Sequence, residues 1–269
     1  MKKLSVLLPL LLALTLAGSA RTADEKLSAA DIISKHLTAI GGKEALAKIK
    51  TRVAIGTVRR ENQADVPMYI FSEAPDRVSA AYVFQDSTWR LLYDKGKNVF
   101  RPSLTREYTV VEDKYKEMMA SGLMFNGMAL YNALLADAGE AKMEAKGTKK
   151  VNGRPAYVIE YRRDKKSGTS RLFFDTETFM WVRTEFGRVT ISKQIGAFTN
   201  DVESKSDENP TVDFYVETAD FREVDGVRLP FKMTQVVTFP IVRQKLVGTI
   251  NCTITEYKQN IEIDQKMFQ

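Results

Sequence analysis

The sequence predicts an α+β protein whose main element is a strongly curved antiparallel sheet of about eleven strands, wrapped around or covered by a few helices. From Thr51 onward, apolar and polar residues alternate along most of the chain, and this two-residue period is that of a strand. Short turn signals separate the strands, so consecutive strands should pair antiparallel. Several strands carry bulky side chains on both faces, with Phe173 and Trp181 expected opposite to Phe174 and Phe186. One face must therefore meet helix or ligand, which a curved sheet allows better than a flat sandwich does.

Residues 1–20 have the pattern of a cleavable export signal. A basic start and an apolar run up to Leu16 precede small residues that end at Ala20, the position expected for signal peptidase cleavage. No cysteine follows the apolar run, so the segment is not a lipoprotein signal. We therefore expect a cleaved signal peptide at 1–20, a single domain at 21–269, and export to the periplasm.

Two short helices are expected before the first strand. Ser28 and Asp31 form a start like a capping box, in which side chains satisfy the free N–H groups of the first helical turn. The apolar residues that follow lie on one side of a helix, which ends at Gly41. A second helix is expected from Lys43 to Ile49.

The turns between strands have recognisable chemistry. Asn152-Gly153 and Asp225-Gly226 each join two strands, because both dipeptides accept the positive φ that a tight hairpin turn requires. Asp175 begins another turn, in which its side chain can accept N–H groups of the next residues. These hairpins predict an antiparallel meander.

Residues 115–135 interrupt the strands with an apolar helical pattern rich in methionine. On a helix, bulky apolar side chains cover most of the circumference and leave only a narrow stripe of small residues. The pattern alone favours a buried core helix. The alternative is a lid that lies in a concave sheet, where pliable methionines suit varied apolar ligands. Because the segment is inserted among strands, we favour a lid that packs the sheet when ligand is absent. Asn126-Gly127 leaves open whether it forms one helix or two.

Residues for catalysis or metal binding are not arranged in any known pattern. His36 is the only histidine, and we expect it to have a surface or core-edge role. The chain has no nucleophile elbow, zinc-protease motif or phosphate-binding glycine loop. Cys252 is the only cysteine, so it forms no disulfide within the chain, and we expect it to be buried. We predict a protein that is not an enzyme and needs no cofactor or metal.

The charge and composition restrict the partners. The chain is 44% hydrophobic and 28% charged with a formal net charge of +6, which allows a full core and a mildly basic surface. In an exported protein this excess points to anionic lipid head groups, with a transient contact with the membrane or a membrane protein, or to no charged partner at all, and nucleic acid is an unlikely partner.

Candidate ligand-binding residues are the large apolar side chains of the lid segment and of the strands. Each of them fits ordinary core packing as well as ligand contact. They are Met118, Met119, Leu123, Met124, Phe125 and Met128 from the lid segment, and Tyr69, Phe71, Phe174, Phe186, Phe231 and Met233 from the strands.

Several motifs occur in a distinctive order along the chain. They are the helix end Ala39-Ile40-Gly41-Gly42 with Glu44-Ala45-Leu46, the turn Val151-Asn152-Gly153-Arg154 followed by AYVIEY, and the segments LFFDTETFMWVRTEF, DFREVDGVRLPFKM and ITEYKQNIEIDQKMF. In this order and spacing they resemble the periplasmic lipoprotein carriers and the outer-membrane lipoprotein-sorting family that shares their LolA/LolB-like fold.

The resemblance implies an open half-barrel whose concave face binds acyl chains beneath a helical lid. It also implies an arginine that holds the closed state, for which Arg52, Arg59 and Arg60 in the first strand are candidates. The chain is longer than a minimal carrier. The resulting hypothesis is a periplasmic carrier or chaperone for acyl chains of lipoprotein or another lipid. The alternative is an envelope sensor or protein-interaction module of the same fold with no transport role.

Overall fold

The computed structural model describes residues 27–60, 63–75, 77–85, 88–94, 97–102, 109–110, 125, 128–129, 142–162, 168–190, 211–241 and 244–269. Its elements are α1 (Ala29–Ala39), α2 (Gly42–Ala47), β1 (Thr51–Arg60), β2 (Val66–Glu73), β3 (Arg77–Val83), β4 (Thr88–Asp94), β5 (Lys97–Pro102), β6 (Thr109–Val110), β7 (Lys142–Val151), β8 (Arg154–Arg162), β9 (Ser170–Asp175), β10 (Trp181–Thr190), β11 (Thr211–Val224), β12 (Val227–Ile241), β13 (Gln244–Gln259) and the 3-10 turn η2 (Gln265–Phe268).

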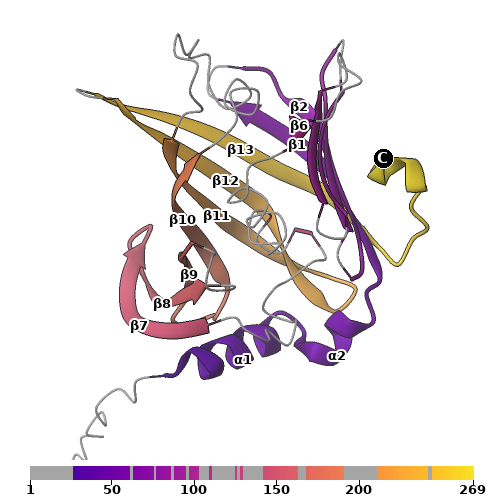
Figure 1. The fold of residues 1–269 in the computed structure, drawn as a ribbon. Helices are drawn as coiled ribbons and strands as arrows, with labels where there is room; N and C mark the ends of the chain where they lie inside the picture. The colour runs from indigo at the N-terminus through magenta and orange to yellow at the C-terminus, as the bar shows by residue number, and fades with distance from the viewer. Residues whose placement is uncertain are drawn as a thin grey trace, which may run out of the picture.

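All thirteen strands form one antiparallel sheet, in the order β6-β5-β4-β3-β2-β1-β13-β12-β11-β10-β9-β8-β7. Two meanders, β1 to β6 and β7 to β13, are therefore joined where the last strand pairs with the first. Figure 1 shows that the sheet is strongly curved, so that it has an inner and an outer face. Within the described residues β6 and β7 remain as separate edges, so the sheet is open.

The predicted antiparallel curved sheet is confirmed, with two differences. The sheet has thirteen strands, because the short strands β5 and β6 follow the four predicted after the helices. The described residues contain only two α-helices, both short, so the predicted helical cover is found only in part. These helices lie across one end of the sheet (Figure 1).

The two faces of the sheet carry separate clusters of apolar side chains. The inner face holds the main cluster, which joins side chains from both meanders, including Ala54 and Leu172, to Ile32 and Leu37 of α1. On the outer face η2 packs against β3 and β4, and Val53 of β1 packs with Ile263 and Phe268 of the C-terminal segment. Figure 1 shows η2 on the side of β1 and β2 opposite to the interior of the curve.

Charged side chains pair across the outer face of β8 to β11. Arg183 contacts both Glu217 and Glu185, and its guanidinium lies 3.3 Å from the Glu185 carboxylate. Arg171 lies 3.6 Å from Glu185 and 3.8 Å from Glu160. Partly exposed pairs of this kind contribute little stability each, but they mark this face as the one that meets water.

The predicted helix start and helix end are both present. Ser28 Oγ accepts a hydrogen bond from the Asp31 amide at 3.1 Å, and the Asp31 carboxylate accepts one from the Ser28 amide at 3.1 Å. Gly41 ends α1 with φ 122°, and a Cβ there would collide with the carbonyl oxygen of Gly226. The helix pair is thereby held against the β11–β12 turn, where the Arg228 amide donates to the Ile40 carbonyl at 3.0 Å.

The two predicted hairpin turns have the expected backbone. Asn152 and Gly153 have φ of 49° and 82°, and Asp225 and Gly226 have 50° and 79°. Positive φ at both central residues gives a turn whose twist matches the flanking strands. This is why the dipeptides were sufficient to locate these hairpins.

The side of the sheet on which Trp181 lies differs from the sequence-based expectation. Trp181 was expected to share a face with Phe173, but it pairs with Phe174 and lies in the inner cluster beside it. The reason is a shift of register between Trp181 and Arg183, which inserts an extra residue and reverses the alternation. Phe173 packs on the other face with Val158.

Candidate functional site

The inner face is the candidate binding surface. Of the predicted strand residues, Phe174, Phe186, Phe231 and Met233 all lie in its main cluster, and none is more than 7% exposed. They come from β9, β10 and β12, so the sheet brings them together from distant parts of the chain. Their expected position on the concave face is therefore found, whereas their contact with a ligand stays a prediction.

Three described residues of the 115–135 segment cover this face. Phe125 and Met128 are fully buried and Ala129 is 2% exposed, all within the inner cluster. The Met128 amide donates to the Phe125 carbonyl at 2.9 Å, which closes a tight turn. Met118, Met119, Leu123 and Met124 lie outside the described residues, as does the choice between one helix and two.

Tyr69 and Phe71 were placed on the wrong face. Phe71 packs on the outer face against Val53 and Phe268, and Tyr69 stacks on Phe71 with ring centroids 6.1 Å apart. Met68 and Ile70, which alternate with them along β2, are fully buried in the inner cluster instead. Both alternating sets of side chains along this strand contain large apolar residues, so the sequence did not show which set faces inward.

Arg52 links the first strand to the inserted segment. Its side chain is 3% exposed, and Nη1 donates to the Ala129 carbonyl at 3.4 Å. Nη2 and Nε donate to Gln259 Oε1 at 3.0 and 3.3 Å. Burial lowers the pKa of Arg52 to about 10, so the guanidinium stays charged at neutral pH. Of the other candidates, Arg59 is exposed and lies 3.6 Å from Asp65.

Gln259 is itself held by the end of β11. Gln259 Nε2 donates to the Val224 carbonyl at 3.0 Å, next to the turn that meets Gly41. Tyr257, which lies beside Arg52, donates its hydroxyl to the Pro230 carbonyl, and burial raises the pKa of this phenol. Gln259 thus holds Arg52 on the strand side, while Nη1 of Arg52 reaches the described Ala129 of the segment.

His36 is buried, contrary to the surface or core-edge position expected. It is 3% exposed, and its Nδ1 lies 2.9 Å from the Phe179 carbonyl, so this nitrogen donates the hydrogen bond. Its ring packs against Phe174 and Trp181, with centroids 5.1 and 6.3 Å away. Burial lowers the pKa of His36 to about 4, so the ring is neutral at physiological pH. His36 docks α1 onto the β9–β10 turn.

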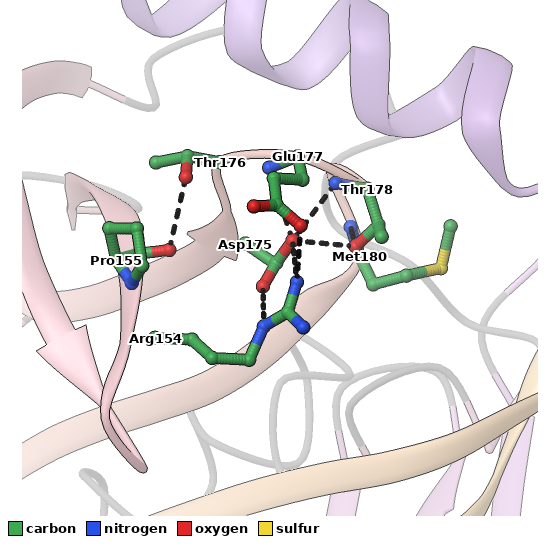
Figure 2. Close-up of polar contacts among 7 residues, drawn as sticks. All are labelled: Arg154, Pro155, Asp175, Thr176, Glu177, Thr178 and Met180. Atoms are coloured by element: carbon green, nitrogen blue, oxygen red, sulfur yellow. Dashed lines mark hydrogen bonds and ion pairs between the residues drawn. The ribbon is translucent and has the colours of Figure 1, made fainter.

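The carboxylates at that turn have a structural role (Figure 2). Arg154 donates from Nε to Asp175 at 2.8 Å and from Nη2 to Glu177 at 2.9 Å. Asp175 also accepts from the Glu177 amide at 3.1 Å and from the Thr178 amide at 2.9 Å, as predicted for this turn. Burial alone raises the pKa of Asp175, but these hydrogen bonds lower it to about 2. A carboxylate paired in this way holds the turn.

Other reactive groups are also buried or dispersed. Burial raises the pKa of the Cys252 thiol to about 12, as fits the expected small buried side chain. Within the described ranges, no group of three or more His, Cys, Asp or Glu side chains is placed to hold a metal ion. In the same part of the chain, no helix is long and apolar enough to cross a membrane.

Comparison with known proteins identifies the fold. No protein-family model and no curated protein matches the sequence. Among solved structures, a domain described as an outer membrane lipoprotein-sorting protein from Vibrio parahaemolyticus matches with TM-score 0.53 and 10% identity, over 88% of this chain and 94% of that one. A DUF1329 family protein from Desulfovibrio piger matches with TM-score 0.51 and 9% identity, over 90% and 97%.

A LolA superfamily protein from Nitrosomonas europaea is similar over 90% of this chain and 98% of that one, with TM-score 0.49 and 11% identity. The class that the structure defines is thus a single open antiparallel sheet with an apolar inner face. More particularly, its fold is that of the lipoprotein-sorting domain, which confirms the resemblance expected from the sequence at the level of the fold.

Proposed function

We propose that the chain is a non-enzymatic periplasmic carrier or chaperone that holds acyl chains of lipoprotein or another lipid against the inner face of the sheet. The observation that carries this proposal is the cover of that face. Phe125 and Met128 are fully buried there, yet they come from an insertion between strands and are tied to β1 through Arg52. A cover joined to the sheet in this way is suited to exchange with an apolar ligand.

The binding step is displacement of this cover. Burying a Phe or Met side chain contributes about 1.5–3 kcal/mol, so releasing Phe125 and Met128 costs roughly 3–6 kcal/mol. An acyl chain gains about 0.8 kcal/mol per buried CH₂ group, and a chain of about ten such groups therefore exceeds that cost. A short ligand does not offset the cost of displacing the cover. The inner face therefore binds long acyl chains in preference to small apolar molecules.

Arg52 controls the balance between the two states. Its hydrogen bond to the Ala129 carbonyl exists only while the segment covers the face, whereas its bonds to Gln259 lie wholly within the strand framework. Release of the segment therefore breaks the charge-assisted hydrogen bond to Ala129, while the bonds to Gln259 still pair the guanidinium. In this proposal Arg52 is the candidate that holds the closed state.

The direct test is to purify the protein from the periplasm, extract it with organic solvent and identify bound molecules by mass spectrometry. A stoichiometric lipid or acylated peptide supports the carrier. An unrelated periplasmic protein of similar size, carried through the same purification, controls for adhering lipid. Protein that is consistently empty and instead copurifies with one tight protein partner contradicts the carrier and supports the sensor or interaction module.

A further inference from the structure

Gln235 of β12 lies in the middle of the inner face. It pairs with Val216 of β11 on one side and with Ile250 of β13 on the other. Met233 and Val237, two residues away in each direction along β12, share its face because side chains alternate along a strand. All four of these neighbours are buried members of the inner cluster. An amide side chain is thus surrounded by apolar groups at the proposed binding surface.

The side-chain amide of Gln235 is buried among apolar groups. The residue is 6% exposed, and its Nε2 has no hydrogen-bond partner among the residues that the structure describes. An amide in apolar surroundings costs free energy unless it is paired. A methionine of similar volume at this position avoids that cost, so packing alone does not account for glutamine here.

Other buried polar groups of the sheet differ from Gln235. Thr218, on the same face of the neighbouring strand, donates its hydroxyl to the Trp181 carbonyl at 2.6 Å. Ser79 has an unpartnered hydroxyl, but it pairs with Phe71 and so lies on the outer face, away from the proposed binding surface. Gln235 combines an unpaired donor with a place on the inner face.

We propose that Gln235 donates a hydrogen bond from Nε2 to a carbonyl oxygen of the bound ligand, the ester or amide carbonyl that joins an acyl chain to the rest of the lipid. This inference rests on the proposed function and names its substrate class. The amide is neutral, and a neutral donor suits an ester or amide carbonyl. A free fatty acid would bring a carboxylate next to Gln235, whose four neighbours are apolar, and burial of a carboxylate requires a cation or several donors. The ligand class is therefore acylated lipid or acylated peptide.

Two phospholipids that differ only in this carbonyl test the proposal. Dipalmitoyl phosphatidylglycerol has ester-linked chains, and dihexadecyl phosphatidylglycerol has the same chain length with ether links and no carbonyl. Binding of each is measured by native mass spectrometry for the wild-type protein, for Gln235→Met and for Thr234→Val. Thr234 is the matched control, because it adjoins Gln235 on β12 but faces outward and bonds to Asn251 at 3.1 Å.

We expect the wild-type protein and Thr234→Val to bind the ester lipid about tenfold more tightly than the ether lipid, which is the value of one buried hydrogen bond. In Gln235→Met the ester lipid should lose this advantage while the ether lipid binds as before. Equal binding of both lipids by the wild-type protein overturns the role of Gln235. An ester preference that survives in Gln235→Met overturns it as well. Both outcomes leave the carrier function intact. Failure of the wild-type protein to bind either lipid contradicts the proposed function itself.

A second measurement on the wild-type protein does not depend on the folding of any variant. With isotope-labelled ester carbonyls, the infrared carbonyl band of the bound lipid should shift to the lower frequency of a hydrogen-bonded ester. A band that stays at the position seen for the lipid in an apolar solvent overturns the proposal.

Discussion

The two faces of the sheet bury apolar side chains in different ways. On the outer face, η2 at the C-terminal end closes a small cluster around Val53, and its backbone is tied to the sheet where Arg90 donates to the Lys266 carbonyl at 3.1 Å. On the inner face, Arg52 of β1 donates a 3.4 Å hydrogen bond to Ala129 of the 115–135 segment, and Nε2 of Gln235 has no hydrogen-bond partner among the described residues. In the proposed function the outer cover is permanent structure, whereas the inner cover is exchanged for ligand.

Truncation of the outer cover should have the largest effect on stability and none on binding. Phe268 is 5% exposed, and its ring lies 4.2 Å from the Arg77 guanidinium. Phe268→Ala should lower the free energy of unfolding by about 3–5 kcal/mol because it leaves a cavity under η2. Urea denaturation measures this change. A shift in lipid affinity beyond about twofold would show that the two faces are coupled and would break the distinction.

The docking of α1 on the inner face should be sensitive to acid. The pKa of buried His36 is about 4, below its ordinary value of 6.5, so the unfolded chain binds the proton more readily between these pH values. The stability that depends on neutral His36 is complete above about pH 6.5 and is lost as the pH falls toward 4, by about 3 kcal/mol in total. The free energy of unfolding, measured with urea across this pH range, should fall more steeply with decreasing pH for the wild-type protein than for His36→Leu. Parallel pH profiles would contradict the assignment.

Truncation of the inner cover should weaken folding and strengthen binding together. Met128→Ala removes packing that exists only in the covered state, so the free energy of unfolding of the ligand-free protein should fall by about 2 kcal/mol. Displacement then costs about 2 kcal/mol less, and lipid affinity should rise about thirtyfold. Phe71→Ala, on the outer face of β2, is the control and should leave affinity unchanged. Unchanged affinity in Met128→Ala would mean that the segment is ordinary core.

The smallest expected effect is a gain. Gln235→Met should raise the stability of the ligand-free protein by about 1 kcal/mol, because it removes an unpaired buried amide at nearly constant volume. Thermal or urea unfolding measures the change. A loss of stability in this variant would indicate that the amide is already satisfied in the free protein, and the difference between the two faces would then be smaller than we infer.

Features fixed by a few adjacent residues were predictable from the sequence. The Asn152-Gly153 turn, the Asp175 turn and the Ser28 cap each depend on local backbone geometry and on hydrogen bonds within a few residues. The antiparallel order followed from the chain of hairpins. These levels of structure need no knowledge of which segments meet in space.

Features set by contacts between distant segments were harder to predict. Tyr69 was placed on the wrong face because side chains on both faces of β2 are apolar. Trp181 was placed on the wrong face because a register shift reversed the alternation. The burial of His36 depends on the β9–β10 turn, which is remote in sequence. Gln235 is a polar residue at an inward position between Met233 and Val237. Its unusual position can be recognised only when the register of β12 is known.

The central claim is that lipid displaces the segment that covers the inner face. Amide hydrogen exchange of Met128, whose N–H is bonded to the Phe125 carbonyl at 2.9 Å, tests it most directly when measured by NMR with and without saturating dipalmitoyl phosphatidylglycerol. The Asn260 amide, bonded to the Thr51 carbonyl at 2.9 Å outside this segment, is the internal reference. The account predicts that lipid lowers the protection of Met128 and leaves Asn260 unchanged. Protection of Met128 that stays constant or rises on binding would contradict it.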